Sequence, residues 1–211
     1  MATHPGHTVL QVPVPQLETF VRARTAHYDA DYVSADPDYV HAHVTALGPF
    51  LPPEAIGGPE RDSILEILRE TEPFEFVLAR VATFPNGIIH LVPEPEEPFR
   101  RLTARLARAF PQCPPYAGQF PDVRPHLTLD AVSDSVSDSV SEASTRRLLG
   151  ELVPARCRAE RLDLAWYEQG GCRVLASWPL GPQDGMVGPS RRDVVTPAAR
   201  AVSVPVSDPR T

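Results

Sequence analysis

One three-residue pattern, His-x-Thr, occurs twice in the chain, each time within a short apolar segment. The two copies are His43-Val44-Thr45 and His126-Leu127-Thr128, 83 residues apart (126 − 43). Alternate residues of a β-strand point to the same face, so each copy presents an imidazole and a hydroxyl side by side. The middle apolar residue turns to the other face. Such a repeat predicts two similar α/β halves that face a common cleft.

Hydrophobic periodicity around the motifs predicts alternating strands and helices. Strands are expected at residues 8–14, 41–50, 73–84, 87–93, 124–130, 156–167 and 172–179. Helices are expected at residues 15–29, 60–71, from 98 to about 110, and in a segment that ends near 152. The second motif lies in a strand that follows a helix, as the first does, and this order favours two pseudo-equivalent α/β lobes.

The folded domain is expected to span residues 1–181. Residues 182–211 are rich in Pro, Gly, Ser and Ala without an apolar period, which is typical of a disordered tail. Residues 133–142 repeat the unit Ser-Asp-Ser-Val, which predicts a polar connector whose last residues cap the following helix.

The chain carries 20 basic residues, all arginine, against 27 acidic residues, a net charge of −7. Binding to long nucleic acid needs clustered positive charge, so a small nucleotide or one RNA end is the more suitable partner. The cysteines at 113, 157 and 172 lack metal-binding or paired spacing, which predicts free thiols in a reducing compartment. Without a signal peptide or a segment of membrane-spanning length, we expect a cytoplasmic protein, by default a monomer.

Two imidazoles and two hydroxyls in one cleft suit phosphodiester cleavage. One imidazole accepts a proton from the attacking water and the other donates a proton to the leaving oxygen. Histidine can do both, because its unperturbed pKa of about 6.5 leaves both forms populated near neutrality. The threonine hydroxyls can donate hydrogen bonds to the non-bridging phosphate oxygens.

Other interpretations remain open at this stage. A single strand histidine is more often structural than catalytic, and threonine is common in strands for its β-propensity. His41 precedes the first motif by two residues, so a three-histidine zinc site with His43 and His126 is a minor alternative. His90 could reach the cleft from an adjacent strand, but a position at a sheet edge or facing solvent is favoured. No role is expected for three further histidines, His4, His7 and His27.

The flanks of both motifs resemble a known family. The matching segments are TVLQVPVP (8–15), AHVTALGPFLPP (42–53), LVPEPEEPFRRLTARLARAFP (91–111) and PPYAGQFPDVRPHLTL (114–129). Over residues 8–181 the chain resembles the 2H phosphoesterase superfamily, and within it the bacterial 2′-5′ RNA ligase or cyclic phosphodiesterase-like (LigT-like) proteins.

The resemblance implies an α+β, LigT-like bilobal fold with antiparallel sheets facing a central cleft. It implies opening of 2′,3′-cyclic phosphates, action on ADP-ribose 1″,2″-cyclic phosphate, or joining or cleavage of 2′-5′ RNA linkages, with no metal and no cofactor. The family's catalytic residues correspond to His43, Thr45, His126 and Thr128, with His126 as base and His43 as acid.

Two further functions stay open beside cyclic-phosphate hydrolysis. One is a non-catalytic protein that holds a nucleotide or an RNA end. The other is 2′-5′ RNA ligation or end processing, which here must be independent of ATP, because the chain has no lysine to carry a nucleotidyl group. Phosphate-binding and dinucleotide-binding glycine motifs are absent from the sequence.

Four residues near the motifs are candidates for substrate contact. Tyr116, Phe120 and Arg124 precede the second motif, and Phe50 follows the first. An aromatic ring can stack on a base, and a guanidinium can pair with a phosphate. The alternative is ordinary packing for the aromatic residues and a surface ion pair for Arg124.

Overall fold

The computed structural model describes residues 6–120, 122–131 and 140–182. Its strands are β1 (His7–Pro13), β2 (His43–Leu47), β3 (Phe74–Thr83), β4 (Ile88–Glu94), β5 (Leu127–Ala131), β6 (Ala155–Ala159), β7 (Arg161–Tyr167) and β8 (Arg173–Pro179). Its α-helices are α1 (Glu18–Tyr28), α2 (Gly58–Arg69), α3 (Glu97–Ala109) and α4 (Glu142–Leu149). The elements expected from periodicity are therefore present, with one exception near residue 160.

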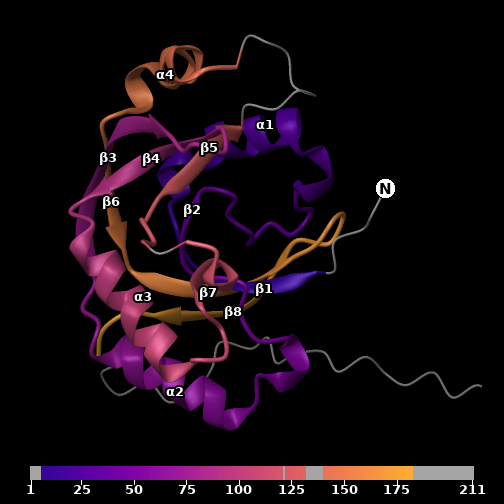
Figure 1. Cartoon of the computed structure of the whole chain (residues 1–211), viewed down its shortest axis with the longest axis vertical. Coiled ribbons are helices and arrows are strands. Elements are labelled where there is room, and N and C mark those ends of the chain that lie inside the picture. The colour runs from indigo at the N-terminus through magenta and orange to yellow at the C-terminus, as the bar shows by residue number, and fades with distance from the viewer. Residues whose placement is uncertain (1–5, 121, 132–139, 183–211) are drawn as a thin grey trace, which may run out of the picture.

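The strands form one curled antiparallel sheet in the order β6-β3-β4-β5-β2-β1-β7-β8 (Figure 1). Four strands lie on each side of the contact between β5 and β2. That contact pairs Leu127 with Val44, the middle residues of the two motifs. The expected mixed α/β fold with antiparallel strands is confirmed, and the two halves share a single sheet that joins at the motifs.

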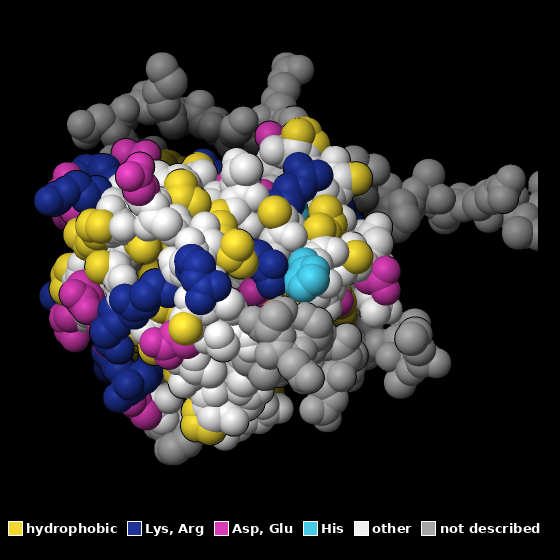
Figure 2. All heavy atoms as spheres, turned by 90° about the horizontal axis from the view of Figure 1, so that it is seen from above, with side chains coloured by type: hydrophobic (Ala, Val, Ile, Leu, Met, Phe, Trp, Pro, Cys, Tyr) yellow, Lys and Arg dark blue, Asp and Glu magenta, His cyan; other side chains and the backbone are white. Residues whose placement is uncertain are grey.

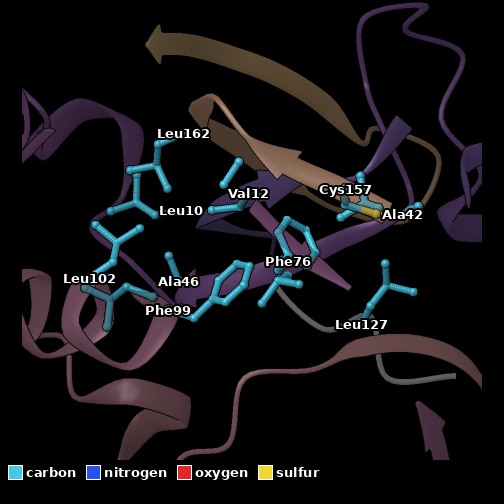
Figure 3. Close-up of a cluster of buried hydrophobic side chains, with 14 of the residues drawn as sticks. Leu10, Val12, Ala42, Ala46, Phe76, Phe99, Leu102, Leu127, Cys157 and Leu162 are labelled. Atoms are coloured by element: carbon cyan, nitrogen blue, oxygen red, sulfur yellow. The ribbon is translucent and has the colours of Figure 1, made fainter. Parts of the chain in front are cut away.

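The two faces of the sheet have different surroundings. Val44 and Leu127 are fully buried in an apolar core that includes Phe99 and Leu102 of α3 (Figure 3). Helix α1 lies on the opposite face and contacts β5. The same alternation that buries the middle residue of each motif therefore directs the histidine and threonine away from the α3 side.

The predicted strand at 156–167 is wrong as a single element. It divides at Glu160 into β6, at one edge of the sheet, and β7, in the other half. Ala155, Cys157 and Ala159 are buried in strict alternation, whereas residues 162–165 are all buried. At Glu160 the chain passes from one half of the sheet to the other, because the curl of the sheet brings its two edges together. There the Leu180 amide donates to the Glu160 carbonyl at 2.8 Å.

Several smaller predictions can be compared directly with the structure. Ser141 caps α4 by accepting a hydrogen bond from the Ser144 amide at 3.1 Å, as the connector predicted. The three cysteines are free and buried. No helix in the described part of the chain is long and apolar enough to cross a bilayer. The predicted disordered tail, from 183 onward, and connector residues 132–139 lie outside the described residues.

Candidate active site

Both motifs line one cavity of about 290 Å³ at the centre of the sheet. Its lining includes His43 and Thr45 from β2, and His126 and Thr128 at the start of β5. These four side chains are half-buried, in contrast to the fully buried middle residues. The structure thus brings the four predicted catalytic residues together, because adjacent antiparallel strands carry them on one face.

The ring of His126 has a fixed tautomer. Its Nδ1 lies 2.8 Å from the carbonyl oxygen of Arg124, and a carbonyl can only accept, so Nδ1 carries the proton. The Nε2 lone pair is left for chemistry. Burial lowers the pKa of His126, and the Arg124 carbonyl partly offsets that shift. A ring with this orientation exchanges its second proton at Nε2, which suits either an acid or a base.

His43 is held in a less polar environment. Burial lowers its pKa to about 4, although the carbonyls of His41 and Val40 act in the opposite direction. Its Nδ1 is buried and makes no hydrogen bond of ordinary geometry with the described residues. His43 is consequently harder to protonate in the free protein than an exposed histidine.

Glu18 of α1 holds the segment that leads into β2. One carboxylate oxygen accepts from the Ala42 amide at 3.0 Å and the other lies 2.7 Å from Nδ1 of His41. Nε2 of His41 accepts from the Ser34 amide at 3.0 Å. Both nitrogens of His41 are therefore occupied by the protein, which argues against the three-histidine zinc site. His41 instead fixes the backbone just before His43.

Tyr116 connects the two motifs. Its ring stacks on His126 with centroids 6.0 Å apart, and its hydroxyl interacts with the Thr45 side chain. Its amide donates to the Gly48 carbonyl at 2.7 Å, which ties this loop to the end of β2. Tyr116 and Ala117 have φ of 50° and 54°, a left-handed conformation that costs energy for such residues. The structure places Tyr116 in the cavity wall, as predicted.

The other three candidates lie elsewhere. Phe120 is 49% exposed and touches the edge of Tyr116 rather than the cavity. Arg124 points outward and pairs with Asp122 at 3.5 Å, while its backbone carbonyl orients His126. Phe50 is buried in the core against Phe110, so its predicted substrate contact is not supported. Closeness to a motif in the sequence therefore does not predict whether a side chain lines the cavity, packs in the core or faces solvent.

The expected edge or solvent-facing position of His90 is wrong. His7, for which no role was expected, lines the cavity beside Tyr167. His90, expected at an edge or facing solvent, is 4% exposed and lies on β4 directly opposite Thr128. Its ring stacks on Phe84 at 3.8 Å and meets the edge of His126 at 5.4 Å. His90 is therefore part of the packing that supports the second motif.

Two further features of the site are not indicated by any local pattern in the sequence. Gln11 is buried opposite Thr45 on β1, in the position that His90 has relative to Thr128. In addition, all five tyrosines of the chain line the cavity: Tyr28, Tyr32, Tyr39, Tyr116 and Tyr167. Two of them, Tyr32 and Tyr39, come from the segment between α1 and β2, whose path over the sheet no local pattern predicts.

A family model for the 2′-5′ RNA ligase superfamily matches residues 13–171. The chain belongs to the 2′-5′ RNA ligase superfamily. Two solved structures illustrate the shared fold of this superfamily member: a crystal structure described as a phosphoesterase and that of E. coli LigT complexed with 3′-AMP. Each has a TM-score of 0.50 and 14% sequence identity, and the match covers 84% of this chain and 99% of the other.

E. coli LigT in its apo form is similar to the same degree, with a TM-score of 0.50, 14% identity, and coverage of 85% of this chain and 99% of that chain. The comparison with curated proteins found no match. At this identity the structural likeness establishes the fold, and the chemistry has to be argued from the cavity.

Proposed function

We propose that this protein is a metal-independent phosphodiesterase that hydrolyses a 2′,3′-cyclic nucleotide phosphate by two-histidine acid–base catalysis. The observation that carries the proposal is the convergence of two imidazole–hydroxyl pairs on one cavity, from the two strands that join the halves of the sheet. An ADP-ribose cyclic phosphate or a 2′-5′ linkage would present the same phosphodiester to these groups.

The proposed reaction needs one proton on the histidine pair. The neutral imidazole takes a proton from water as the water oxygen bonds to phosphorus. The bond from phosphorus to one ribose oxygen breaks, and the protonated imidazole delivers its proton to that oxygen. Each transfer contributes a factor of roughly 10²–10⁴. Thr45 and Thr128 donate hydrogen bonds to the non-bridging oxygens, where negative charge builds up.

The environments of the two histidines favour an assignment of roles. Burial depresses the pKa of both, and the depression is large for His43. The first proton on the free pair therefore resides on His126, which would make His126 the acid and His43 the base. This is the reverse of what the family resemblance implied, and the two assignments give different results for substrates with a good leaving group.

The size of the cavity supports a small substrate. Its volume of about 290 Å³ lies just below the roughly 300–1,000 Å³ common for small-molecule sites. Seen from the side of α1 and α4, a run of arginine side chains with carboxylates beside it crosses the lower left of this face (Figure 2). The small cavity and the net charge of −7 favour a mononucleotide, like the 3′-AMP in the LigT structure, over a long RNA.

The test measures turnover of 2′,3′-cyclic mononucleotides, and of an RNA with a 2′,3′-cyclic phosphate end, in the presence of EDTA. His43→Ala and His126→Ala are compared with the exposed variant His27→Ala. We expect activity that survives EDTA, is retained in His27→Ala and falls by at least a hundredfold in each motif variant. Full activity in either motif variant contradicts the two-histidine mechanism, and loss with EDTA indicates a metal.

The same assay separates the other functions. Appearance of a 2′-5′ linkage when a 5′-hydroxyl RNA is added indicates ligation, and binding without any product indicates a non-catalytic protein. The pH dependence gives a further check. Because both pKa values lie below the ordinary histidine value, kcat/KM is expected to be bell-shaped with its maximum on the acid side of about pH 6.5. A flat profile from pH 5 to 9 would contradict the mechanism.

A further inference from the structure

The cavity extends from the motifs to a second end lined with aromatic rings, here called the tyrosine end. It consists of Tyr28, Tyr32, Tyr39 and Tyr167. The rings of Tyr32 and Tyr167 are stacked, with centroids 4.7 Å apart and planes 24° apart. The Tyr39 hydroxyl is buried beside the Cys172 thiol and has no hydrogen bond of ordinary geometry to the described residues. Flat aromatic rings suit a planar, uncharged ring system.

Positive charge is missing from this cavity. None of the described residues that line it is arginine, aspartate or glutamate, so its only ionisable cations are histidines. Arg24 of α1 is the nearby candidate, but it forms an ion pair with the buried carboxylate of Asp130. A phosphate that entered the tyrosine end would find no guanidinium to neutralise it.

The tyrosine end is also negatively biased. Tyr28 is the last residue of α1, so the carbonyl end of the helix dipole lies there. Asp29 follows it directly. Burial raises the pKa of Tyr32, and the carboxylates of Asp29 and Asp31 raise it further. Asp29 contributes in the same direction at Tyr28 and Tyr167. These charges oppose an additional anion at this end.

We propose that the tyrosine end binds the uncharged base of the substrate, and that the cavity selects nucleotides whose only phosphate is the one at the motifs and rejects nucleotides with a second phosphate on the 5′ side. The proposal rests on the proposed function for its orientation, because it places the reacting phosphate between His43 and His126. It narrows the substrate class to mononucleotides with a free 5′-hydroxyl, and disfavours ADP-ribose derivatives and the 5′-extended end of an RNA.

Calorimetric binding tests this selectivity without relying on turnover. The ligands are adenosine 2′-monophosphate and adenosine 2′,5′-bisphosphate at one fixed ionic strength. For the unmodified protein we expect the second phosphate to weaken binding at least tenfold. Tyr32→Ala should weaken the binding of adenosine 2′-monophosphate by about tenfold, the effect expected when a base loses an aromatic ring on which it stacks. Equal or tighter binding of the bisphosphate, or no binding of either ligand, overturns the proposal.

Two variants locate the cause of the selectivity. Asp29→Asn removes one carboxylate at the tyrosine end, and should reduce the penalty for the second phosphate severalfold. Asp62→Asn, a matched change on the exposed surface of α2, should leave the penalty unchanged. Equal effects of the two variants overturn the electrostatic argument. Parallel turnover of adenosine 2′,3′-cyclic phosphate separates the two hypotheses: selective binding without turnover overturns only the proposed function, and turnover without selectivity overturns only this inference.

Discussion

The ion pair between Arg24 and Asp130 provides the sharpest test of how the two motifs are held together. Asp130 lies on β5 two residues after Thr128, and its side chain is 1% exposed. Arg24, on α1, is 16% exposed and donates through Nε at 2.7 Å and through a second nitrogen at 2.5 Å. The pair therefore fastens α1 to the strand of the second motif.

Removing Arg24 leaves a buried carboxylate with no opposite charge. The remaining hydrogen bond, from the Ala131 amide to Asp130 at 3.0 Å, does not neutralise it. Breaking a buried pair in this way costs about 3–5 kcal/mol of unfolding free energy. In a domain of this size, roughly 2–4 °C of melting temperature is lost per kcal/mol, so Arg24→Ala should melt about 6–20 °C below the unmodified protein.

The control is the exposed pair of Arg101 with Glu97 on α3, whose side chains are 69% and 65% exposed and 3.7 Å apart. Such pairs contribute at most about 1 kcal/mol, so Arg101→Ala should change stability little. Replacing Arg24 and Asp130 together by leucine should recover most of the loss, because no uncompensated charge remains.

The measurement is urea unfolding followed by the fluorescence of the two tryptophans, Trp166 and Trp178, which lie on β7 and β8. The denaturant slope should stay constant across the variants, so that a change of midpoint reports a change of stability. If Arg24→Ala lost less than about 1 kcal/mol of unfolding free energy, as expected for Arg101→Ala, the ion pair would not stabilise the packing of α1 on β5 as its burial implies.

Four further outcomes are expected. The folded-state pKa of His43, about 4, lies below the unfolded value near 6.5. The stability contribution of His43 is therefore present above about pH 6.5 and is lost as pH falls toward 4. Melting curves at pH 7.5 and 4.5 should show that His43→Gln loses less stability at the acid pH than the unmodified protein does. If His126 is the acid, His126→Ala should keep far more activity than His43→Ala on a 4-nitrophenyl phosphodiester, whose leaving group needs no proton, and the opposite ranking would support the assignment implied by the family. Tyr116→Phe keeps the stack on His126 and loses the Thr45 contact, so steady-state kinetics should show a modest loss of kcat. Tyr116→Ala should lower kcat roughly a hundredfold, because His126 is then misplaced. Equal losses of kcat in the two variants would refute a positioning role of the ring. His90→Ala should lower kcat by about tenfold with little change in KM, because His126 loses the ring that packs against it. His90→Phe should keep most of the kcat of the unmodified protein. If it does not, the imidazole itself is required.

Local patterns predicted much of the fold because they depend on near neighbours in the chain. Apolar alternation located the strands, and helical periodicity located α3, whose buried residues are Phe99, Leu102 and Leu106. The same patterns could not predict that one strand ends and another begins near Glu160, since the residues on both sides of it have the apolar pattern of a β-strand. Only the curl of the sheet, which brings its edges together, gives the division a physical cause.

The candidate site divides in a similar way. His43, Thr45, His126 and Thr128 were predicted because a two-residue spacing in a strand dictates a shared face, whatever the rest of the fold does. Phe50 was a candidate for substrate contact only because it follows the first motif in the sequence, and it does not line the cavity. It lies beyond the end of β2, where strand alternation no longer governs direction, and the structure packs it against Phe110.

The sequence by itself determined which chemistry is available, because the residue types and their alternation within each motif are local properties. The tertiary structure alone decided what surrounds that chemistry. Pairing of β2 with β5 brought residues 83 positions apart into one cavity, and cross-strand contact put His90 beside His126. The path of the chain between α1 and β2 placed Tyr32 and Tyr39 in the cavity wall. These features depend on long-range strand pairing and sheet curvature, which no window of neighbouring residues encodes.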